Sequence, residues 1–226
     1  MNYLLLIDTA VETASVCLAA EDRILGEKEN AAQRDHAAWL QPAIRDLCTE
    51  TGIPLSGLSA IAVSAGPGSY TGLRVGMAAA KGLCYALGLP LITLNSLQGM
   101  AAAAAARLPG NGLLCPMIDA RRMEVFTAVY NHALEEIISP HNALLDADSF
   151  AALLKQNEVI FFGNGSHKWK PIVTHKHAAF ENVRASASAM MPLAWASWRN
   201  RSFAELAYCE PFYIKEFYSP ILKRNL

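Results

Sequence analysis

Apolar stretches alternate with polar turns along the whole chain, and the first of them predict a β-meander. Continuous apolar runs at residues 3–7 and 14–19 are separated by a polar turn that carries Asp8 and Thr9, so they predict a β-hairpin. Residues 23–29 can supply a third strand. A dinucleotide-binding domain would open with a strand–helix–strand unit instead, so this start argues against that fold.

Two helices are predicted in the first half of the chain. Residues 35–49 carry apolar side chains at helical spacing, and Pro42 within them predicts a kink or a local break. The second helix is predicted at 75–87, where small residues such as Gly76 and Ala80 would let another helix approach closely. Internal packing and a subunit interface both explain such a surface. We favour the interface, because so much small surface allows contact on two sides.

The string GPGSYTGLR at residues 66–74 directly follows an apolar run at 60–65 that predicts a buried strand. A glycine-rich turn between a strand and a helix can bring backbone N–H groups close to an anion. The glycine spacing is neither that of a dinucleotide fingerprint nor that of a P-loop. An anion site and a tight turn that binds nothing are therefore equally good interpretations.

The second half of the chain is predicted to continue with strands and shorter helices. The best candidate for a boundary is the turn at 109–112, and residues 167–180 are irregular and mildly basic. A glycine turn at 163–165 follows a predicted strand and can approach a ligand. We predict strands at 91–94, 113–118, 124–130 and 159–162, helices at 96–107, 146–155, 186–196 and 203–208, and an extended segment at 210–215.

The composition indicates a packed protein that does not grip nucleic acid unaided. The 226 residues are 53% hydrophobic and 17% charged, with a formal net charge of −1, so a large core is expected and long disorder is not. Without a basic excess, an RNA role would need a partner. The five cysteines are scattered, which favours buried thiols in a reducing cytosol. Neither a signal peptide nor a membrane span is predicted.

Groups that could carry chemistry are present but poorly placed. Ser69 does not lie in a GxSxG nucleophile elbow, so a loop hydroxyl or a helix cap is the better interpretation. His175 and His177 have a spacing that can bind a metal, but no third ligand lies nearby in the sequence. Asp8 could orient a metal-bound phosphate or accept hydrogen bonds in a turn. The turn at 119–122 fits structural ion pairs and a partner contact about equally well.

Five strings along the chain, in this order, resemble those of one bacterial family. They are LLIDTA at 5–10, SV at 15–16, GPGSYTGLR at 66–74, IDARRMEVF at 118–126 and EPFY at 210–213. The family is TsaB, also called YeaZ, which by name is grouped with the M22 peptidase-like, or glycoprotease, proteins. The resemblance implies an actin/sugar-kinase/Hsp70-like (ASKHA) fold, an α/β architecture of two related lobes that each contain a mixed β-sheet flanked by helices.

The resemblance further implies a lobe at 1–108 and another at 109–226, with the segment from about residue 198 onward packing back on the first lobe. It implies a cytoplasmic, non-catalytic scaffold subunit of the complex that adds a threonylcarbamoyl group to the adenosine next to the anticodon of ANN-decoding tRNAs. The subunit would bind and activate the catalytic paralogue TsaD, with TsaE as a further partner. Alone it would form a homodimer. It would contact tRNA only through the complex, and it would not bind a membrane.

One departure from TsaD-like proteins bears on chemistry. Those proteins have a metal-binding HxxxH after the corresponding strand, where this chain has Ser96 and Met100. The resemblance therefore implies no catalytic residue, no metal and no cofactor of its own, with ATP or ADP only at an interface shared in the complex. The alternative is a nucleotide-dependent enzyme or a peptidase on the same scaffold, which an ATP–magnesium titration separates. A third hypothesis is a homodimeric scaffold outside any RNA pathway.

The resemblance also implies where the chain would meet its partners. The two predicted helices form the surface for TsaD or for a second copy, with interface residues His36, Leu40, Ile44, Leu47, Val75, Ala79, Leu83 and Ala86. Loops that would contact a shared nucleotide, or are vestiges of such a site, contain Asp8, Thr9, Gly66, Gly68, Ser69, Tyr70, Thr71, Gly163 and Gly165. Without a metal pair, the glycine string is better interpreted as the start of a helix whose surface contacts a partner.

Overall fold

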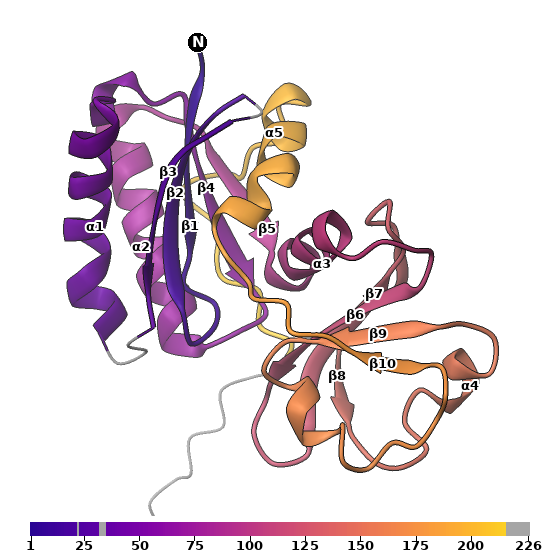
Figure 1. Ribbon diagram of the computed structural model, residues 1–226. Helices are drawn as coiled ribbons and strands as arrows, with labels where there is room; N and C mark the ends of the chain where they lie inside the picture. The colour runs from indigo at the N-terminus through magenta and orange to yellow at the C-terminus, as the bar shows by residue number, and fades with distance from the viewer. Residues whose placement is uncertain (22, 32–34, 216–226) are drawn as a thin grey trace, which may run out of the picture.

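The computed structural model describes residues 1–21, 23–31 and 35–215 of the chain. It contains two five-stranded sheets with the orders β3-β2-β1-β4-β5 and β10-β9-β6-β7-β8, which lie in separate lobes (Figure 1). The strands are β1 (Tyr3–Asp8), β2 (Ala14–Ala20), β3 (Arg23–Asn30), β4 (Ala60–Gly66), β5 (Leu91–Asn95), β6 (Leu113–Asp119), β7 (Glu124–Tyr130), β8 (Glu136–Leu144), β9 (Val159–Phe162) and β10 (Ala178–Phe180).

The two sheets repeat one arrangement of strands. In the first sheet β1 is antiparallel to β2 and parallel to β4, which is parallel to β5. In the second, β6 is antiparallel to β7 and parallel to β9, which is parallel to β10. This repetition, with helices flanking mixed sheets, is the ASKHA fold of two related lobes that the resemblance implied.

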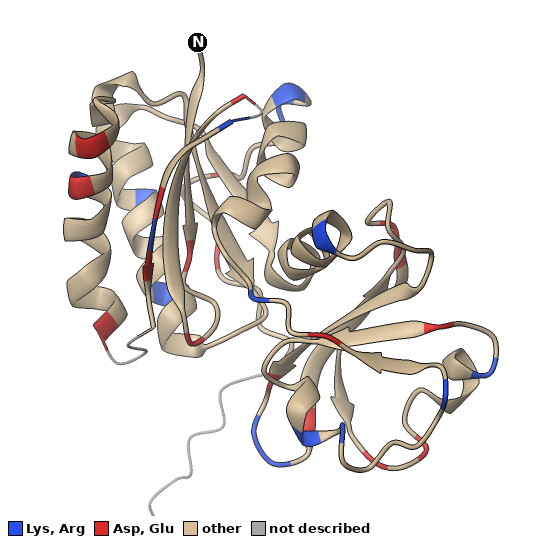
Figure 2. Ribbon diagram, viewed as in Figure 1, with Lys and Arg blue, Asp and Glu red and all other residues tan. Residues whose placement is uncertain are grey.

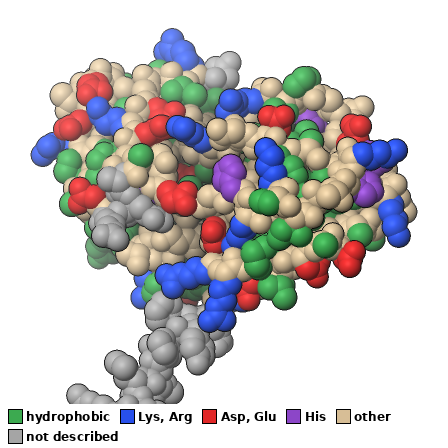
Figure 3. All heavy atoms as spheres, turned by 60° about the horizontal axis from the view of Figure 1, so that its bottom comes forward, with side chains coloured by type: hydrophobic (Ala, Val, Ile, Leu, Met, Phe, Trp, Pro, Cys, Tyr) green, Lys and Arg blue, Asp and Glu red, His purple; other side chains and the backbone are tan. Residues whose placement is uncertain are grey.

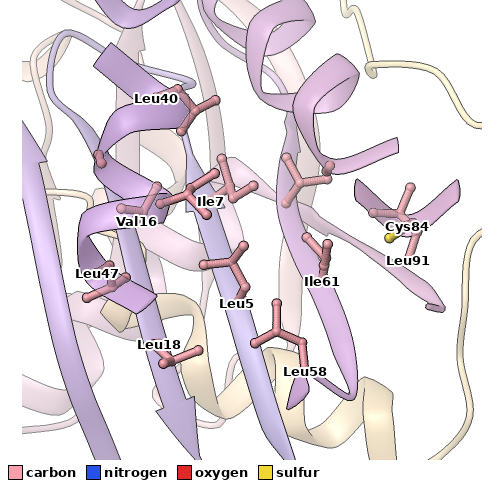
Figure 4. Close-up of a cluster of buried hydrophobic side chains, with 14 of the residues drawn as sticks. Leu5, Ile7, Val16, Leu18, Leu40, Leu47, Leu58, Ile61, Cys84 and Leu91 are labelled. Carbon is pink, nitrogen blue, oxygen red and sulfur yellow. The ribbon is translucent and has the colours of Figure 1, made fainter. Parts of the chain in front are cut away.

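Two long helices cover one face of the first sheet. They are α1 (His36–Thr51) and α2 (Tyr70–Leu87), and they enclose a cluster of buried aliphatic side chains from β1, β2 and β4. Figure 4 shows Leu40 and Leu47 of α1 pointing toward Leu5 and Ile7 of the sheet. Strand β1 is apolar without interruption because helices bury it on both faces.

The other face of the first sheet is covered by a segment from the C-terminal part of the chain. The turn η4 (Ser188–Met190) and helix α5 (Met191–Arg199) pack there, with Ala187 and Ala194 fully buried. Further on, the N–H of Ala204 donates to the carbonyl of Leu91 at the edge strand. The chain therefore returns to the first lobe at Ala187, earlier than residue 198.

Helix α3 (Ser96–Arg107) lies between the lobes and packs on the second sheet. Its buried face consists largely of alanines, and small side chains let the helix approach the strands closely. On the opposite face of that sheet Trp169 packs among Phe150, Phe161 and Phe180. The short helix α4 (Ala151–Leu154) and the turn η3 (Ser166–Lys168) complete this layer.

The structure corrects a predicted helix break and a predicted helix start. Helix α1 runs through Pro42 without a break. Pro42 is exposed, and water can replace the missing backbone hydrogen bond there. Helix α2 begins at Tyr70 rather than at 75, because the Ser69 hydroxyl accepts a hydrogen bond from the Gly72 N–H and caps the first turn.

Other predictions for the second half were wrong. Residues 203–208 are not helical, since Ala204 pairs with β5 instead. The helix predicted at 146–155 is reduced to α4, which follows a left-handed Phe150. Strands β8 and β10 were not predicted. The five cysteines are free, and four are buried, as expected. No helix in the described part of the chain is long and apolar enough to cross a membrane.

Candidate functional site

A groove of about 470 Å³ lies where the two lobes meet. It opens at the carboxyl ends of β1, β4, β6 and β9, the edge at which ligands of α/β sheets usually bind. Of the predicted loop residues, Gly68, Ser69, Tyr70 and Thr71 line the groove. Asp119 and Arg121, from the turn at 119–122, and Asn164, from the glycine turn at 163–165, also line it, and the sequence analysis had singled out both turns. Sequence reasoning did not select the other lining side chains, which include Glu12, Phe126, Tyr213 and Lys215.

The remaining predicted loop residues do not line this groove. Asp8 and Thr9 are 4% and 0% exposed, and Gly66 and Gly165 also lie behind the lining. Gly163 lines a second cavity of about 300 Å³, which shares Val11, Glu12 and Asn164 with the groove. Of the predicted loop residues, the groove therefore takes in only those at 68–71.

The buried carboxylate of Asp8 links strands β1 and β4. Its Oδ1 accepts a hydrogen bond of 2.6 Å from the Ser64 hydroxyl and one of 3.0 Å from the Ala10 N–H. Burial raises the pKa of Asp8, against the lowering effect of these hydrogen bonds and of positive charge on His36. Its bonded partners are within the fold, so Asp8 acts as a structural link there.

Asp8→Asn is expected to flatten the pH dependence of stability. A raised pKa in the folded state means that the folded chain binds this proton more tightly than the unfolded chain does. This stabilisation is present below the usual pKa of 3.8 and is lost as the pH rises through the folded pKa. Above the folded pKa the wild-type chain retains a buried carboxylate, whereas asparagine is uncharged at every pH and can still accept both hydrogen bonds.

Urea unfolding of both proteins between pH 4 and 7 measures this effect. The free energy of unfolding of Asp8→Asn should gain on that of the wild type as the pH rises. The exposed Asp46→Asn serves as the control. A difference between Asp8→Asn and wild type that stays constant with pH would mean that the Asp8 carboxyl titrates alike in the folded and unfolded chains.

Two backbone donors of the glycine loop, the N–H groups of Gly66 and Ser69, are already used within the chain. The Gly66 N–H donates to the Ser96 hydroxyl at 3.1 Å, and the Ser69 N–H donates to the carbonyl of Ala10 at 2.7 Å. A side chain at Gly68 would overlap the same Ala10 carbonyl. The N–H groups of Gly66 and Ser69 and the Oδ1 atom of Asp8 therefore hold the loop in place within the fold.

A segment near the C-terminus lies across the loop. The Phe212 N–H donates to the carbonyl of Ala65 at 2.6 Å. The ring of Tyr213 lies 5.2 Å from that of Tyr70, and its hydroxyl accepts a hydrogen bond from Arg74 Nε at 3.2 Å. Lys215 forms an ion pair with Glu124 of β7. The segment thereby connects the start of α2 to the second lobe along the groove.

Ser96 and Met100, which stand where TsaD-like proteins have two metal-binding histidines, make structural contacts in this chain. Ser96 is buried, and its hydroxyl accepts a hydrogen bond from the Gly66 N–H. Met100 packs against Gly163. His177 Nδ1 is hydrogen-bonded to the carbonyl of Leu154 at 2.8 Å. Among residues 1–21, 23–31 and 35–215, no three His, Cys, Asp or Glu side chains are grouped so that they could hold a metal ion.

Half of the predicted interface residues were assigned to the wrong side of their helix. His36, Leu40, Ile44 and Leu47 are at most 5% exposed, because the apolar stripe of α1 packs against its own sheet. They cannot contact a partner directly in this conformation. Val75, Ala79 and Leu83 are half-buried, and Ala86 is exposed.

A different surface of the two helices faces solvent. We define the outer helix face as Ala37, Ala38, Gln41 and Pro42 of α1 with Ala78, Gly82, Tyr85 and Ala86 of α2, all of which are exposed. Gly76 and Ala80 do not belong to it, because they are buried against the sheet. Tyr85 is 84% exposed, and none of these side chains is charged. Charged residues, among them Arg45, Asp46 and Arg74, are also exposed on these helices, so the outer helix face is the uncharged part of their solvent-facing surface.

The chain is similar to known proteins in sequence and in structure. A family model described as "TsaD: tRNA N6-adenosine threonylcarbamoyltransferase" matches residues 26–207. The chain is 33% identical over 175 residues to the tRNA threonylcarbamoyladenosine biosynthesis protein TsaB of Bacillus subtilis strain 168, covering 75% of this chain and 74% of that protein. It is 28% identical over 226 residues to the Escherichia coli K12 protein of the same name, covering 94% of each.

A solved structure gives the same result. YeaZ from Pseudomonas aeruginosa superimposes on the chain with a TM-score of 0.78 at 28% sequence identity, covering 94% of this chain and 100% of that chain.

Proposed function

The chain belongs to the TsaB (YeaZ) family of tRNA threonylcarbamoyladenosine biosynthesis proteins, and we propose that it is the non-catalytic subunit that binds and activates a TsaD-type transferase. The transferase would add a threonylcarbamoyl group to the adenosine next to the anticodon of ANN-decoding tRNAs. The ATPase TsaE would join the same complex. The chain would reach tRNA through this complex rather than by itself.

The outer helix face is the observation that carries this proposal. Its small side chains let the helices of a partner approach closely, and Tyr85 supplies a rigid aromatic group that is favoured at interface centres. The charged residues Arg45, Asp46 and Lys81 lie on the same helices beside this face. An uncharged centre with a charged rim is the usual anatomy of a protein–protein interface.

Similarity between the chain and the transferase family supports the same face. The family model that matches most of this chain is that of the transferase itself, so the two proteins would share a fold. Proteins of one fold can pair through equivalent helices about a pseudo-two-fold axis, as two copies of one chain do about a true axis. We therefore propose that the free chain forms a homodimer through the outer helix face and that the transferase binds the same face. The two assemblies would then exclude each other.

The groove supports an accessory role. Its loop donors and Asp8 form hydrogen bonds within the fold, and no observation favours a nucleotide-dependent enzyme or a peptidase. A nucleotide at an interface shared in the complex stays a prediction.

Calorimetric titration of the full chain with its cognate transferase tests the proposal. We expect association, and we expect transfer of threonylcarbamoyl to tRNA by the transferase and TsaE to require the chain. No association together with equal transfer in its absence would contradict the proposal. A separate titration of the isolated chain with ATP and magnesium tests the enzyme alternative, for which stoichiometric binding is the positive result.

A further inference from the structure

Two consecutive arginines in the connection between β6 and β7 have left-handed backbone conformations. The φ angle is +69° at Arg121 and +49° at Arg122. Residues with a Cβ rarely adopt this region, which glycine enters without strain. Glycine at both positions would make the turn more easily, yet the chain has two guanidinium groups there. Strain of this kind often marks a functional site.

The side chain of Lys168 fixes the backbone of this turn through hydrogen bonds. Its Nζ donates to Asp119 Oδ1 at 2.9 Å, to the carbonyl of Arg122 at 2.9 Å and to the carbonyl of Glu124 at 2.5 Å. Asp119 Oδ1 also accepts a hydrogen bond of 2.6 Å from the Arg121 N–H. The backbone of the turn is therefore fixed, while both arginine side chains are exposed.

The carboxylates beside the turn are already paired with lysines. Asp119 forms an ion pair with Lys168, and Glu124 forms one with Lys215, which lowers the pKa of Glu124. In the part of the chain that the structure describes, neither arginine side chain forms an ion pair. Figure 2 shows the turn in blue at the foot of the second lobe, and Figure 3 shows blue side chains gathered beside the grey segment on that face. A local positive surface thus exists on a chain whose net charge is −1.

We propose that this arginine turn, residues 120–123, contacts the phosphodiester backbone of tRNA; this inference rests on the proposed function. A guanidinium group matches two phosphate oxygens with a fork of N–H donors, and a fixed backbone reduces the entropy lost on binding. Arg121 also lines the groove that contains Tyr70 and Tyr213. Aromatic rings beside a positively charged surface are typical of single-stranded RNA sites. Within the chain these rings contact each other, with Arg74 4.1 Å from the centre of the Tyr70 ring. An acidic protein segment would meet the same charges and is the alternative outcome of the test.

The double variant Arg121→Gly/Arg122→Gly tests the contact without straining the fold. Glycine accepts both φ angles, so the turn remains while its two charges are lost. The matched control is Arg199→Gln/Arg201→Gly, which removes two exposed charges at the end of α5, remote from the turn (Figure 1). Arg201 also has a positive φ, of +53°, so the control repeats the change in backbone strain at that position.

Each protein, alone at low ionic strength and in complex with the transferase, is titrated with a fluorescently labelled unmodified tRNA transcript over a range of salt concentrations. We expect Arg121→Gly/Arg122→Gly to weaken binding about tenfold, with a log–log salt slope shallower by about two, as the loss of two phosphate contacts predicts. The control should match the wild type. Wild-type affinity in the double variant, an equal loss in the control, or no tRNA binding by the complex that contains the wild type would each overturn the inference.

Calorimetry of the same variants against the transferase separates this inference from the proposed function. If the transferase binds every variant but tRNA affinity is unchanged, the arginine contact is wrong and the proposed function stands. If tRNA affinity depends on the arginines but no variant, wild type included, binds the transferase, the proposed function is wrong and the contact stands. A variant that loses transferase binding alone would identify the turn as a protein contact and overturn the inference.

Discussion

Gly82→Glu is expected to abolish association with the TsaD-type transferase while leaving the chain folded. Gly82 is exposed on α2, and a Cβ added there would meet no atom within 4 Å. The glutamate side chain therefore fits the isolated chain. In a complex it would place an unpaired charge in the uncharged centre of the interface, where such a change weakens binding about 100-fold or more. Calorimetric titration with the transferase measures the loss.

Two controls separate this effect from a change in the fold. Ala196→Glu places the same charge on an exposed position of α5, on the opposite side of the first sheet, and should bind the transferase normally. Circular dichroism of Gly82→Glu should match that of the wild type. If Gly82→Glu binds as the wild type does, the outer helix face is not the docking surface. The homodimer should be lost with the same variant, which sedimentation would detect.

The strands with the clearest signal in the sequence are those buried on both faces. Strands β1, β4 and β9 are short apolar runs whose patterns depend little on their neighbours. Strand β8 is mostly half-exposed and contains Pro140, so its strand conformation depends on pairing with β7. The three-residue β10 likewise depends on β9. The local pattern of apolar and polar residues does not show which strands pair with each other.

The candidate site was only partly predictable for a related reason. Periodicity correctly identified the apolar stripe of α1, but a helix buries such a stripe first against its own sheet. The partner surface that we propose is the remaining face, which has no periodic signal. In the glycine loop, the partners of the N–H groups are Ala10 and Ser96, and Phe212 binds the neighbouring Ala65 carbonyl. Only the folded chain shows that these groups are occupied.

Alanine substitutions at two glycines of α2 are expected to change stability in opposite directions. At Gly72 a Cβ would overlap the carbonyl oxygen of Thr9, and the Thr9 hydroxyl donates to the Gly72 carbonyl at 2.7 Å. Backbone atoms cannot move aside as a flexible side chain can. Gly72→Ala should therefore lower the free energy of unfolding by about 3 kcal/mol, the upper range for overpacking a close contact.

Gly82→Ala is the matched control on the same helix. Its methyl group enters open space, and alanine has the higher helix propensity, so the free energy of unfolding should rise by about 1 kcal/mol. Urea unfolding with a common slope measures both variants. If Gly72→Ala were as stable as the wild type, the close contact between Gly72 of α2 and the Thr9 carbonyl, just after β1, would be wrong. The contact between Gly72 and Thr9 also fixes the position of α2 and thereby of Gly82 on the outer helix face. Gly72→Ala should therefore also weaken association with the transferase, whereas Gly82→Ala should leave it nearly unchanged.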